Sequence, residues 1–506
     1  MKKSFSRRRF LTHITLTSLG FSLLPPTQTF ASTLAQKLSL PFNPIQPSEE
    51  DFLIFPSKII YTILFQEGET LANQDKIWAN HSGIGFLPVL KGSNEGYLWI
   101  NFEKPNAWKR PTNIEELQPT LIEKEMKQTG GVLLPLKNSG NGWEFKKDEN
   151  KGSFAINAFS EVSFAPNNTV IDGYPKAMGL VGAKTVSITP WRTILVSEHN
   201  SEELWDKQLY AWELAYTPPL RHYGWVTQLL PNEQSAQKLV TLGRCNHAGL
   251  DFSADGSVLY FVDAQPNGCL YKYILRTAQS FDEGQLFVAN LTQNRWELIA
   301  EQNKASIPLA TLHQTALEKG GTPLPYPQDL KIDPISHNIF IANKGYGQGE
   351  YPMGNLLRIR EEKANHKATS FTQEIFLKGG EHFAAPAFLL FDHQNNLWLA
   401  TAMSINEMKQ SAYKKFKNNG IFYVPMQGID QGEIFQVGSA PIDAYFSAMA
   451  LAPDRKAMFL SLQPQAEWGK NNKDMKPKSH FPEGNESLPK SLIIVLAGEA
   501  IEKLFT

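Results

Sequence analysis

The sequence predicts an all-β fold, a β-propeller of four-stranded antiparallel blades with loop and short-helix insertions. Two observations carry this prediction: a β-hairpin unit that recurs along the chain, and the scarcity of helical patterns elsewhere. Each unit has a strand of alternating apolar residues, a short turn containing Asp or Pro, and a second strand rich in apolar and aromatic residues. The four units span 249–264, 329–344, 388–402 and 447–462.

The spacing of the hairpins fits a propeller. Their turns contain Asp255, Asp333, Asp392 and Asp454, which follow one another at intervals of roughly 60 to 80 residues. Four-stranded blades recur at such intervals when loops are inserted between them. Each blade buries its faces only against its neighbours, so repetition builds the core. We therefore expect residues 32–506 to form one domain, although the length alone would favour two or three.

The remaining segments supply further strands and few helices. Strands are expected at 184–199, 223–231, 269–275, 284–291 and 354–360, with 492–498 as the last strand that closes the ring. Two capping boxes predict short helices, one from Thr120 with Glu123 and one from Ser404 with Glu407. The stretch 466–490 is polar and rich in Pro, Gly, Asn and Lys, and predicts a long loop over one end of the ring.

The N-terminus has the pattern of an export signal. Lys2, Lys3 and three arginines at 7–9 precede an uncharged stretch at 10–24 that ends in two prolines. The segment 6–11 fits the twin-arginine pattern. Thr29 and Ala31 are small residues at the two positions that a signal peptidase reads, which predicts cleavage after Ala31. The alternative is a membrane anchor, but the apolar stretch is shorter than the roughly 20 residues that a span needs. We expect residues 1–31 to be removed and the mature protein to be periplasmic or extracellular, with no stable membrane span.

Charge and cysteine content narrow the class of protein. The chain has 49 Lys and Arg against 50 Asp and Glu, and removal of residues 1–31 would leave a net charge of about −6. This balance argues against nucleic-acid binding. The two cysteines, Cys245 and Cys269, are read equally well as a disulfide in an oxidising compartment or as two buried thiols.

Several short motifs, in this order and spacing, resemble the PhoX-type alkaline phosphatases. They stand at 101–103, 189–191, 197–200, 223–226, 242–247, 270–273, 284–289 and 397–401. The resemblance covers most of the mature chain. It implies a twin-arginine-exported propeller that holds a calcium and iron cluster and hydrolyses phosphate monoesters.

The chain departs from the pattern that the resemblance implies at positions where the family has acidic or metal-binding residues. Ala248 stands where a Glu is expected, and a Cys that binds iron would align near Ala183 and Lys184. The same comparison puts uncharged residues in place of an Arg or of carboxylates at Tyr326, Gln328, Ala387 and Tyr445. Hard cations such as Ca²⁺ need several converging carboxylates. We therefore expect the cluster to be incomplete or absent.

A partial set of candidate site residues remains. By the resemblance, Arg244 and His247 are the candidate catalytic residues, and the candidate metal ligands are Asn101, Glu103, Glu198, Asn200 and Asp263; His199 lies beside them in sequence. The functional interpretation is a partial site for one metal or one anion, with the Arg244 guanidinium suited to phosphate or carboxylate. The alternative is that the acids are solvated at strand ends and His247 is a hydrogen-bonded structural residue. Because strand ends converge on the channel of a propeller, we expect these residues, with Ala248, Gln328, Ala387 and Tyr445, to share one mouth.

Two functional classes follow. The first is a degenerate, non-catalytic binding or scaffold propeller that takes a small anionic ligand or a phosphate ester. The alternative is an extracytoplasmic, metal-dependent alkaline phosphatase acting on phosphate monoesters. A lactonase-like propeller with one Ca²⁺ is a third class. The chain has no Gly-x-Ser-x-Gly, His-Glu-x-x-His or Cys-x-x-Cys motif and no phosphate-binding Gly-Lys loop, which argues against the chemistries that these motifs carry.

Overall fold

The fold is seen in a computed structural model, which describes residues 40–71, 76–90, 92–106, 119–146, 153–199, 220–302, 311–465 and 477–506. The expected export signal at 1–31 and the candidate ligand Asn200 lie outside these residues. Within the described ranges, no helix has the length and apolar character required to cross a bilayer.

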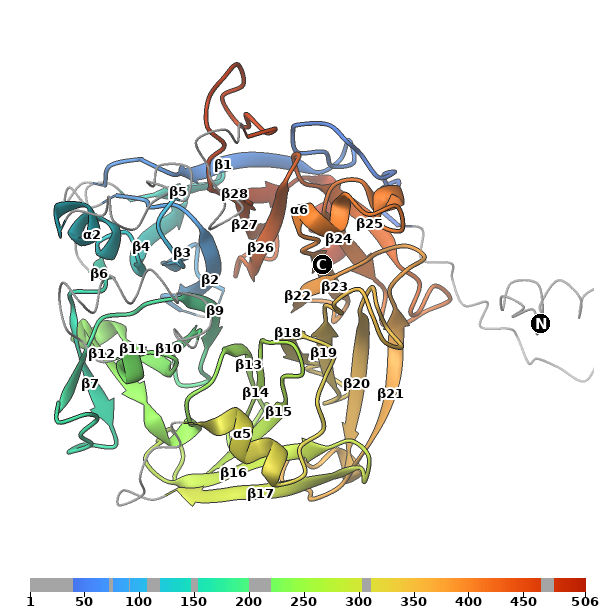
Figure 1. Cartoon of the computed structure of the whole chain (residues 1–506). Coiled ribbons are helices and arrows are strands. Elements are labelled where there is room, and N and C mark those ends of the chain that lie inside the picture. Colours follow the sequence, from blue (N-terminus) through green and yellow to red (C-terminus); the bar gives the residue numbers. More distant parts are fainter. Residues whose placement is uncertain are drawn as a thin grey trace, which may run out of the picture.

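Six β-sheets stand around a central axis as the blades of a propeller (Figure 1). We number the blades 1 to 6 along the chain. Blade 1 consists of β2 (His81–Pro88), β3 (Glu95–Phe102), β4 (Gly130–Asn138), β5 (Trp143–Phe145) and β6 (Phe154–Ile156). Blade 2 consists of β7 (Glu161–Ala165), β8 (Lys176–Met178), β9 (Ala183–Ile188), β10 (Ile194–Glu198), β11 (Val226–Leu230) and β12 (Ser235–Leu239). Blade 3 consists of β13 (His247–Phe252), β14 (Val258–Asp263), β15 (Leu270–Leu275), β16 (Gly284–Asn290) and β17 (Arg295–Gln302).

The second half of the chain builds three four-stranded blades. Blade 4 consists of β18 (Pro327–Ile332), β19 (Ile339–Asn343), β20 (Asn355–Glu361) and β21 (Phe371–Lys378). Blade 5 consists of β22 (Pro386–Phe391), β23 (Leu397–Thr401), β24 (Gly420–Val424) and β25 (Phe435–Ser439). Blade 6 consists of β26 (Ala444–Leu451), β27 (Met458–Pro464), β28 (Leu492–Ala497) and β1 (Ile60–Gln66). The propeller prediction is confirmed.

The predicted hairpin repeat forms the inner hairpins of blades 3 to 6. In each of these blades the first strand lies nearest the axis and pairs antiparallel with the second across the Asp-containing turn. The strands β2 and β9 are the inner strands of blades 1 and 2. Blade 2 departs from pure antiparallel order, because β7 pairs in parallel with β12 and so extends the sheet outward.

The ring is closed by strands from the two ends of the chain. The strand expected at 492–498 is β28, the third strand of blade 6, and β1 pairs antiparallel with it from Ile60 opposite Ala497 to Gln66 opposite Leu492. The outer strand of the last blade therefore comes from the N-terminal part of the chain. This pairing fastens blade 6 to the segment that leads into blade 1.

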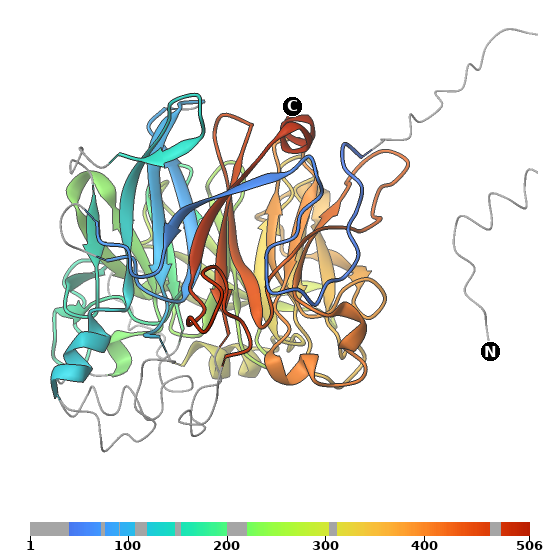
Figure 2. The ribbon, with the colours of Figure 1, turned by 90° about the horizontal axis from the view of Figure 1, so that it is seen from above.

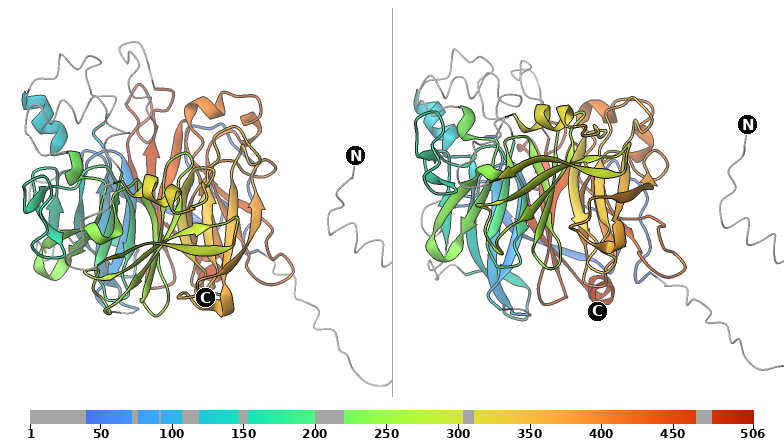
Figure 3. Two further views of the ribbon diagram at one scale, coloured as in Figure 1. Left: turned by 60° about the horizontal axis from the view of Figure 1, so that its bottom comes forward. Right: turned by 90° about the horizontal axis from the view of Figure 1, so that it is seen from below.

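The helices among the described residues are short and lie at the two ends of the ring. The helices α2 (Pro119–Met126), α5 (Leu312–Glu318) and α6 (Ile405–Met408) lie at one end, and α7 (Glu499–Phe505) lies at the other (Figures 2 and 3). The capping box predicted at Ser404 and Glu407 is present at the start of α6. The one predicted at Thr120 is wrong: α2 begins at Pro119, so Thr120 lies inside the helix, where proline at the first position suits the helix start.

The core consists of apolar side chains packed between neighbouring blades. At the junction of blades 1 and 6, for example, the rings of Phe86 and Phe459 stack at 5.2 Å, and Trp143 packs against both edge-on. Such offset and edge-to-face arrangements are those that aromatic pairs prefer. Each pair of neighbouring blades shares an apolar cluster of this kind.

The candidate site at the mouth of the ring

The six inner strands begin at the same end of the axis. Contacts between neighbouring strands establish this: the Ser82 hydroxyl donates to the Ala183 carbonyl, and the Leu389 amide donates to Asp329. Each of these residues is among the first four of its strand. The Ser447 hydroxyl likewise donates to the carbonyl of His81. We call this end the mouth; α2, α5 and α6 lie at the same end (Figure 3).

Every inner strand carries a β-bulge or register irregularity in its pairing with the second strand. The irregularities lie within the first few residues of the inner strand in blades 1, 3, 4, 5 and 6, and next to Glu198 in blade 2. A bulge bends a strand and re-aims its side chains, and bulges are common beside functional sites. The mouth is therefore the one end of the ring where all six blades depart from regular pairing.

The second residues of the six inner strands form a set that we call the mouth ring. Its members are Ser82, Lys184, Ala248, Gln328, Ala387 and Tyr445. Ala248, Gln328, Ala387 and Tyr445 are positions where the sequence suggested lost ligands or charges, and Lys184 lies near the expected place of the iron-binding Cys. The structure places all five at equivalent points of their blades. Ala248 and Ala387 are fully buried, and Tyr445 stacks on Phe388 with ring centres 6.2 Å apart. Lys184 is the only charged member of the ring.

Glu198 is held in a buried ion pair. The ammonium group of Lys238 lies 2.8 and 2.9 Å from its two carboxylate oxygens, and both side chains are completely buried. The amides of Val181 and Trp225 donate to the same carboxylate at 3.1 and 3.2 Å. Burial raises the pKa of Glu198, and the Lys238 charge and these donors act against that rise. Four hydrogen bonds from three groups therefore already engage this carboxylate.

Asp263 ends β14 and is also engaged. Its carboxylate accepts from the Asn246 amide at 3.1 Å and from the Gln265 side chain at 2.6 Å. Nδ1 of His313, on α5, lies 2.9 Å from the same carboxylate, and the His313 side chain is 29% exposed. Asp263 therefore ties the start of α5 to blade 3 at the mouth.

The two candidate catalytic residues lie in the same segment, close to Asp263. His247 pairs with Asp263 across the hairpin, is fully buried, and has Nε2 2.8 Å from the Gly243 carbonyl. Burial lowers the pKa of His247 to about 4, so the imidazole is neutral at pH 7. Arg244 is 3% exposed, and its Nε donates to the Tyr223 carbonyl at 2.6 Å. Both residues thus make backbone contacts that fit a structural role.

Glu103 stands apart from the other acids. It follows β3 and faces Lys184 of blade 2, with 4.0 Å between Nζ and Oε1, and Gln463 of blade 6, with 3.5 Å between Nε2 and Oε2. Burial opposes its ionisation, but the charges of Lys184 and Lys104 outweigh burial and lower the pKa of Glu103 to about 2. Burial and the Lys184 charge likewise lower the pKa of His199 to about 3. Three blades therefore meet around one carboxylate that is ionised at neutral pH.

The donors that remain do not fit a cluster of hard cations. The side-chain oxygen of Asn101 accepts from the Trp99 indole at 2.6 Å, and Asp329 is bound by the amides of Leu330 and Leu389. In the part of the chain that the structure describes, no three His, Cys, Asp or Glu side chains are grouped so that they could hold a metal ion. A cation at Glu198 or Asp263 would first have to displace a lysine, a histidine or backbone donors.

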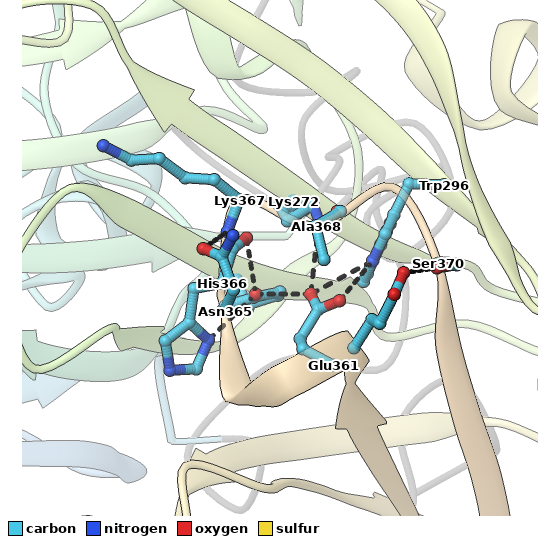
Figure 4. Close-up of polar contacts among 10 residues, drawn as sticks. Lys272, Trp296, Glu361, Asn365, His366, Lys367, Ala368 and Ser370 are labelled. Carbon is cyan, nitrogen blue, oxygen red and sulfur yellow. Dashed lines mark hydrogen bonds and ion pairs between the residues drawn. The ribbon is translucent and has the colours of Figure 1, made fainter.

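The Lys238–Glu198 arrangement recurs at the junction of blades 3 and 4. There Lys272 donates to Glu361 at 3.2 Å and to the Ala368 carbonyl at 2.7 Å, and the Trp296 indole donates to the same carboxylate at 3.0 and 3.1 Å (Figure 4). Both lysines lie over an aromatic ring, Lys238 over Tyr223 at 4.8 Å and Lys272 over Trp296 at 4.3 Å. A buried lysine bound by a glutamate, a carbonyl and a ring is therefore a repeated structural device of this chain.

Sequence reasoning missed four residues that decide the character of the mouth: Lys184 as a charged group, Lys238, His313 and Gln463. Lys238 lies 40 positions from Glu198 in the sequence, and no local sequence pattern predicts that the two side chains are in contact. Lys184 is different, because its place at the start of an inner strand was already visible once the strand at 184–199 had been predicted. Cys245 and Cys269, left open above, are both buried free thiols.

The comparisons with known proteins agree with the fold. The sequence profile of the family described as Alkaline phosphatase PhoX matches residues 40–465. The structure of Pseudomonas fluorescens PhoX in complex with vanadate, a transition state analogue, is similar with a TM-score of 0.76 and 19% identity, covering 91% of this chain and 98% of that one. A Bacteroides thetaiotaomicron protein of unknown function gives a TM-score of 0.40 at 10% identity, covering 87% and 76% of the two chains. A Xanthomonas campestris gluconolactonase gives 0.34 at 10% identity, covering 87% and 99%. A search of curated protein sequences finds no match.

Proposed function

The chain belongs to the PhoX alkaline phosphatase family, and from this premise we propose that it is a non-catalytic member, a binding propeller that has lost the metal cluster. The observation that carries the proposal is the state of the retained acids. Glu198 is neutralised by a buried lysine, and Asp263 is bound by an amide, a glutamine and a histidine. Neither carboxylate offers the free oxygens that a cluster of Ca²⁺ and Fe³⁺ requires.

The mouth ring supports the same proposal. Its members carry no carboxylate, and its single charge is the positive charge of Lys184. A cationic ring disfavours cation binding and favours a small anionic ligand or a phosphate ester. The N-terminal pattern supports export by the twin-arginine route, which would place this binding activity in the periplasm or outside the cell.

The second candidate function is a metal-dependent phosphomonoesterase, and family membership favours it. The similar P. fluorescens protein holds vanadate, which mimics a phosphoryl group in its transition state. In this chain, phosphatase activity would require Glu198 and Asp263 to bind metal ions although both carboxylates already have protein partners. That requirement can be tested directly.

The test compares hydrolysis of p-nitrophenyl phosphate by the mature protein and by a Glu198→Gln/Asp263→Asn variant, with Ca²⁺ and Fe³⁺ supplied to both. We expect no difference between them, and elemental analysis should find no bound metal in the purified protein. Glu198→Gln leaves the buried Lys238 without its counter-ion, so circular dichroism must first show that the double variant is folded. Metal-dependent turnover that the folded double variant loses would establish the phosphatase and refute the binding proposal. The Lys176→Met variant, which breaks an exposed ion pair with Glu161 in the same blade, controls for general effects of substitution.

A further inference from the structure

A cluster of charged and polar side chains at the mouth is built from three blades around Lys184. Blade 1 supplies Glu103 and Lys104, blade 2 supplies Lys184 and His199, and blade 6 supplies Gln463 and Tyr445. Lys184 faces Glu103, and the imidazole of His199 is neutral at pH 7. Because Lys184 is the charged member of the mouth ring, its ammonium group is the one that an anion at the mouth would meet.

The charge on Lys184 is only partly compensated. Its ammonium group lies 4.0 Å from the nearest oxygen of Glu103, whereas Lys238 and Glu198 approach to 2.8 Å. The Lys184 side chain is 13% exposed, so it is largely withdrawn from water but is not sealed in as Lys238 is. An ammonium group in this position interacts strongly with an anion, because the surrounding protein screens it less than bulk water does.

Two buried polar atoms in the same cluster lack a partner within the described ranges. They are Oε1 of Gln463, an acceptor, and Nε2 of His199. A buried polar atom without a hydrogen bond costs about 1–3 kcal/mol, so such atoms call for an explanation. A bound ligand that offers both an anionic oxygen and a hydroxyl would satisfy the ammonium group and the Gln463 oxygen together.

We propose that the mouth carries a metal-independent site for a small oxyanion, in which the Lys184 ammonium group supplies the positive charge that a bound metal ion would otherwise supply. This deepens the proposed binding function and rests on it. Lys184 is the group that contacts the anion. Tyr445 adds a neutral hydroxyl beside Glu103, because burial and that carboxylate hold the pKa of Tyr445 well above its usual range. The expected ligand carries a phosphate or carboxylate group that binds Lys184, and a hydroxyl group that donates to the side-chain oxygen of Gln463.

The experiment measures binding of inorganic phosphate and of glycolate to the mature protein by titration calorimetry, after treatment with EDTA and with EDTA present. We expect at least one of the two anions to bind, more weakly as salt is added. Binding of phosphate alone would identify a phosphate-type site, and binding of glycolate alone a carboxylate site. Binding of neither anion, or binding that appears only when Ca²⁺ replaces EDTA, would overturn the proposal.

Variants at one position test the role of Lys184. Lys184→Met should weaken anion binding about tenfold or more, which is about 1.4 kcal/mol, and Lys184→Arg should retain it. Lys184→Gln serves as a second neutral variant if the methionine variant does not fold. Lys137→Met, which removes an exposed lysine of blade 1, should bind as the parent protein does. Unchanged affinity in a folded Met or Gln variant would show that Lys184 does not bind the anion.

The anion test and the phosphatase test can fail separately. Metal-dependent turnover would refute the non-catalytic proposal while leaving metal-free anion binding to be measured on its own. Absence of anion binding in EDTA would refute the Lys184 site even where no turnover is found.

Discussion

Both carboxylate oxygens of Glu198 accept from the ammonium group of Lys238, in a place where neither side chain touches water. Glu198 was expected from the sequence to bind metal. Its actual partner makes it part of the framework of blade 2, since Lys238 also donates to the carbonyl of His222 at 2.8 Å.

Removal of Lys238 should destabilise the protein strongly. Lys238→Met leaves the Glu198 charge buried without its counter-ion, which typically costs about 3–5 kcal/mol. A Lys238→Met/Glu198→Gln double variant should recover part of that loss, because a neutral amide can still accept from Val181 and Trp225. Urea unfolding measures both. The exposed pair of Lys176 and Glu161 is the control, and Lys176→Met should cost less than about 1 kcal/mol. If Lys238→Met and Lys176→Met lowered the free energy of unfolding equally, the structural role of Lys238 would be contradicted.

His247 should make the protein less stable in mild acid. The pKa of His247 in the folded protein, about 4, lies below the ordinary histidine value of about 6.5, so the unfolded chain takes up this proton first as the pH falls. Stability is therefore lost between about pH 6.5 and pH 4, by about 2 kcal/mol from pH 7 to pH 5 for this residue. His247→Gln keeps a donor near the Gly243 carbonyl but does not titrate. Denaturation at the two pH values should show a smaller pH dependence in the variant; an undiminished one would mean that His247 is not held neutral.

Neutralising Lys184 should give the mouth some affinity for cations. Glu103 then loses the positive charge that does most to favour its ionised form, because the Lys184 ammonium group lies 4.0 Å from its carboxylate in the parent protein. Terbium luminescence should report binding to Lys184→Gln roughly tenfold tighter than to the parent protein. The gain should vanish in Lys184→Gln/Glu103→Gln. If Lys184→Gln binds terbium no more tightly than the parent protein, Lys184 does not keep cations away from the Glu103 carboxylate.

Truncation should separate the export segment from the ring. A chain that starts at Ser32 should melt at the same temperature as the full chain, because the packed strands begin later, at β1. A chain that starts at Glu67 lacks β1, exposes the edge of β28 and loses the buried ring of Phe65. Its melting temperature should fall by several degrees or more. Circular dichroism during heating measures this; loss of folding in the Ser32 chain would show that residues 1–31 contribute to the core.

Local sequence patterns predicted the inner hairpins but not their partners. The Asp-containing turns of blades 3 to 6 were visible because a tight turn demands particular residues within a few positions. The β2–β3 connection at 89–94 has no Asp, and blade 1 was correspondingly missed as a repeat. The pairing of β1 with β28 joins opposite ends of the chain, and no local preference encodes such a contact.

The candidate site shows the same division between local and distant information. The sequence places Glu198 and Asp263 at strand ends and Glu103 after a strand, and the structure has them there, because strand periodicity sets where a strand stops. What each carboxylate contacts depends on side chains from other strands or blades, such as Lys238, His313 and Gln463. The chemistry of a retained acid could therefore be judged only from its partners in three dimensions.

The pairing of Ile60 with Ala497 also sets the order of events during synthesis. Ribosomes release the chain from its N-terminus, so β1 emerges among the first strands and must wait for one of the last before it can pair. Blades 1 to 5 can form while blade 6 is still being translated. During that time β1 is unpaired, and an unpaired strand can pair with other chains and aggregate. Joining such distant segments is slow because the intervening loop must first be closed. We expect refolding of the full-length protein to show a late, slow phase in which the signal from blade 6 appears last.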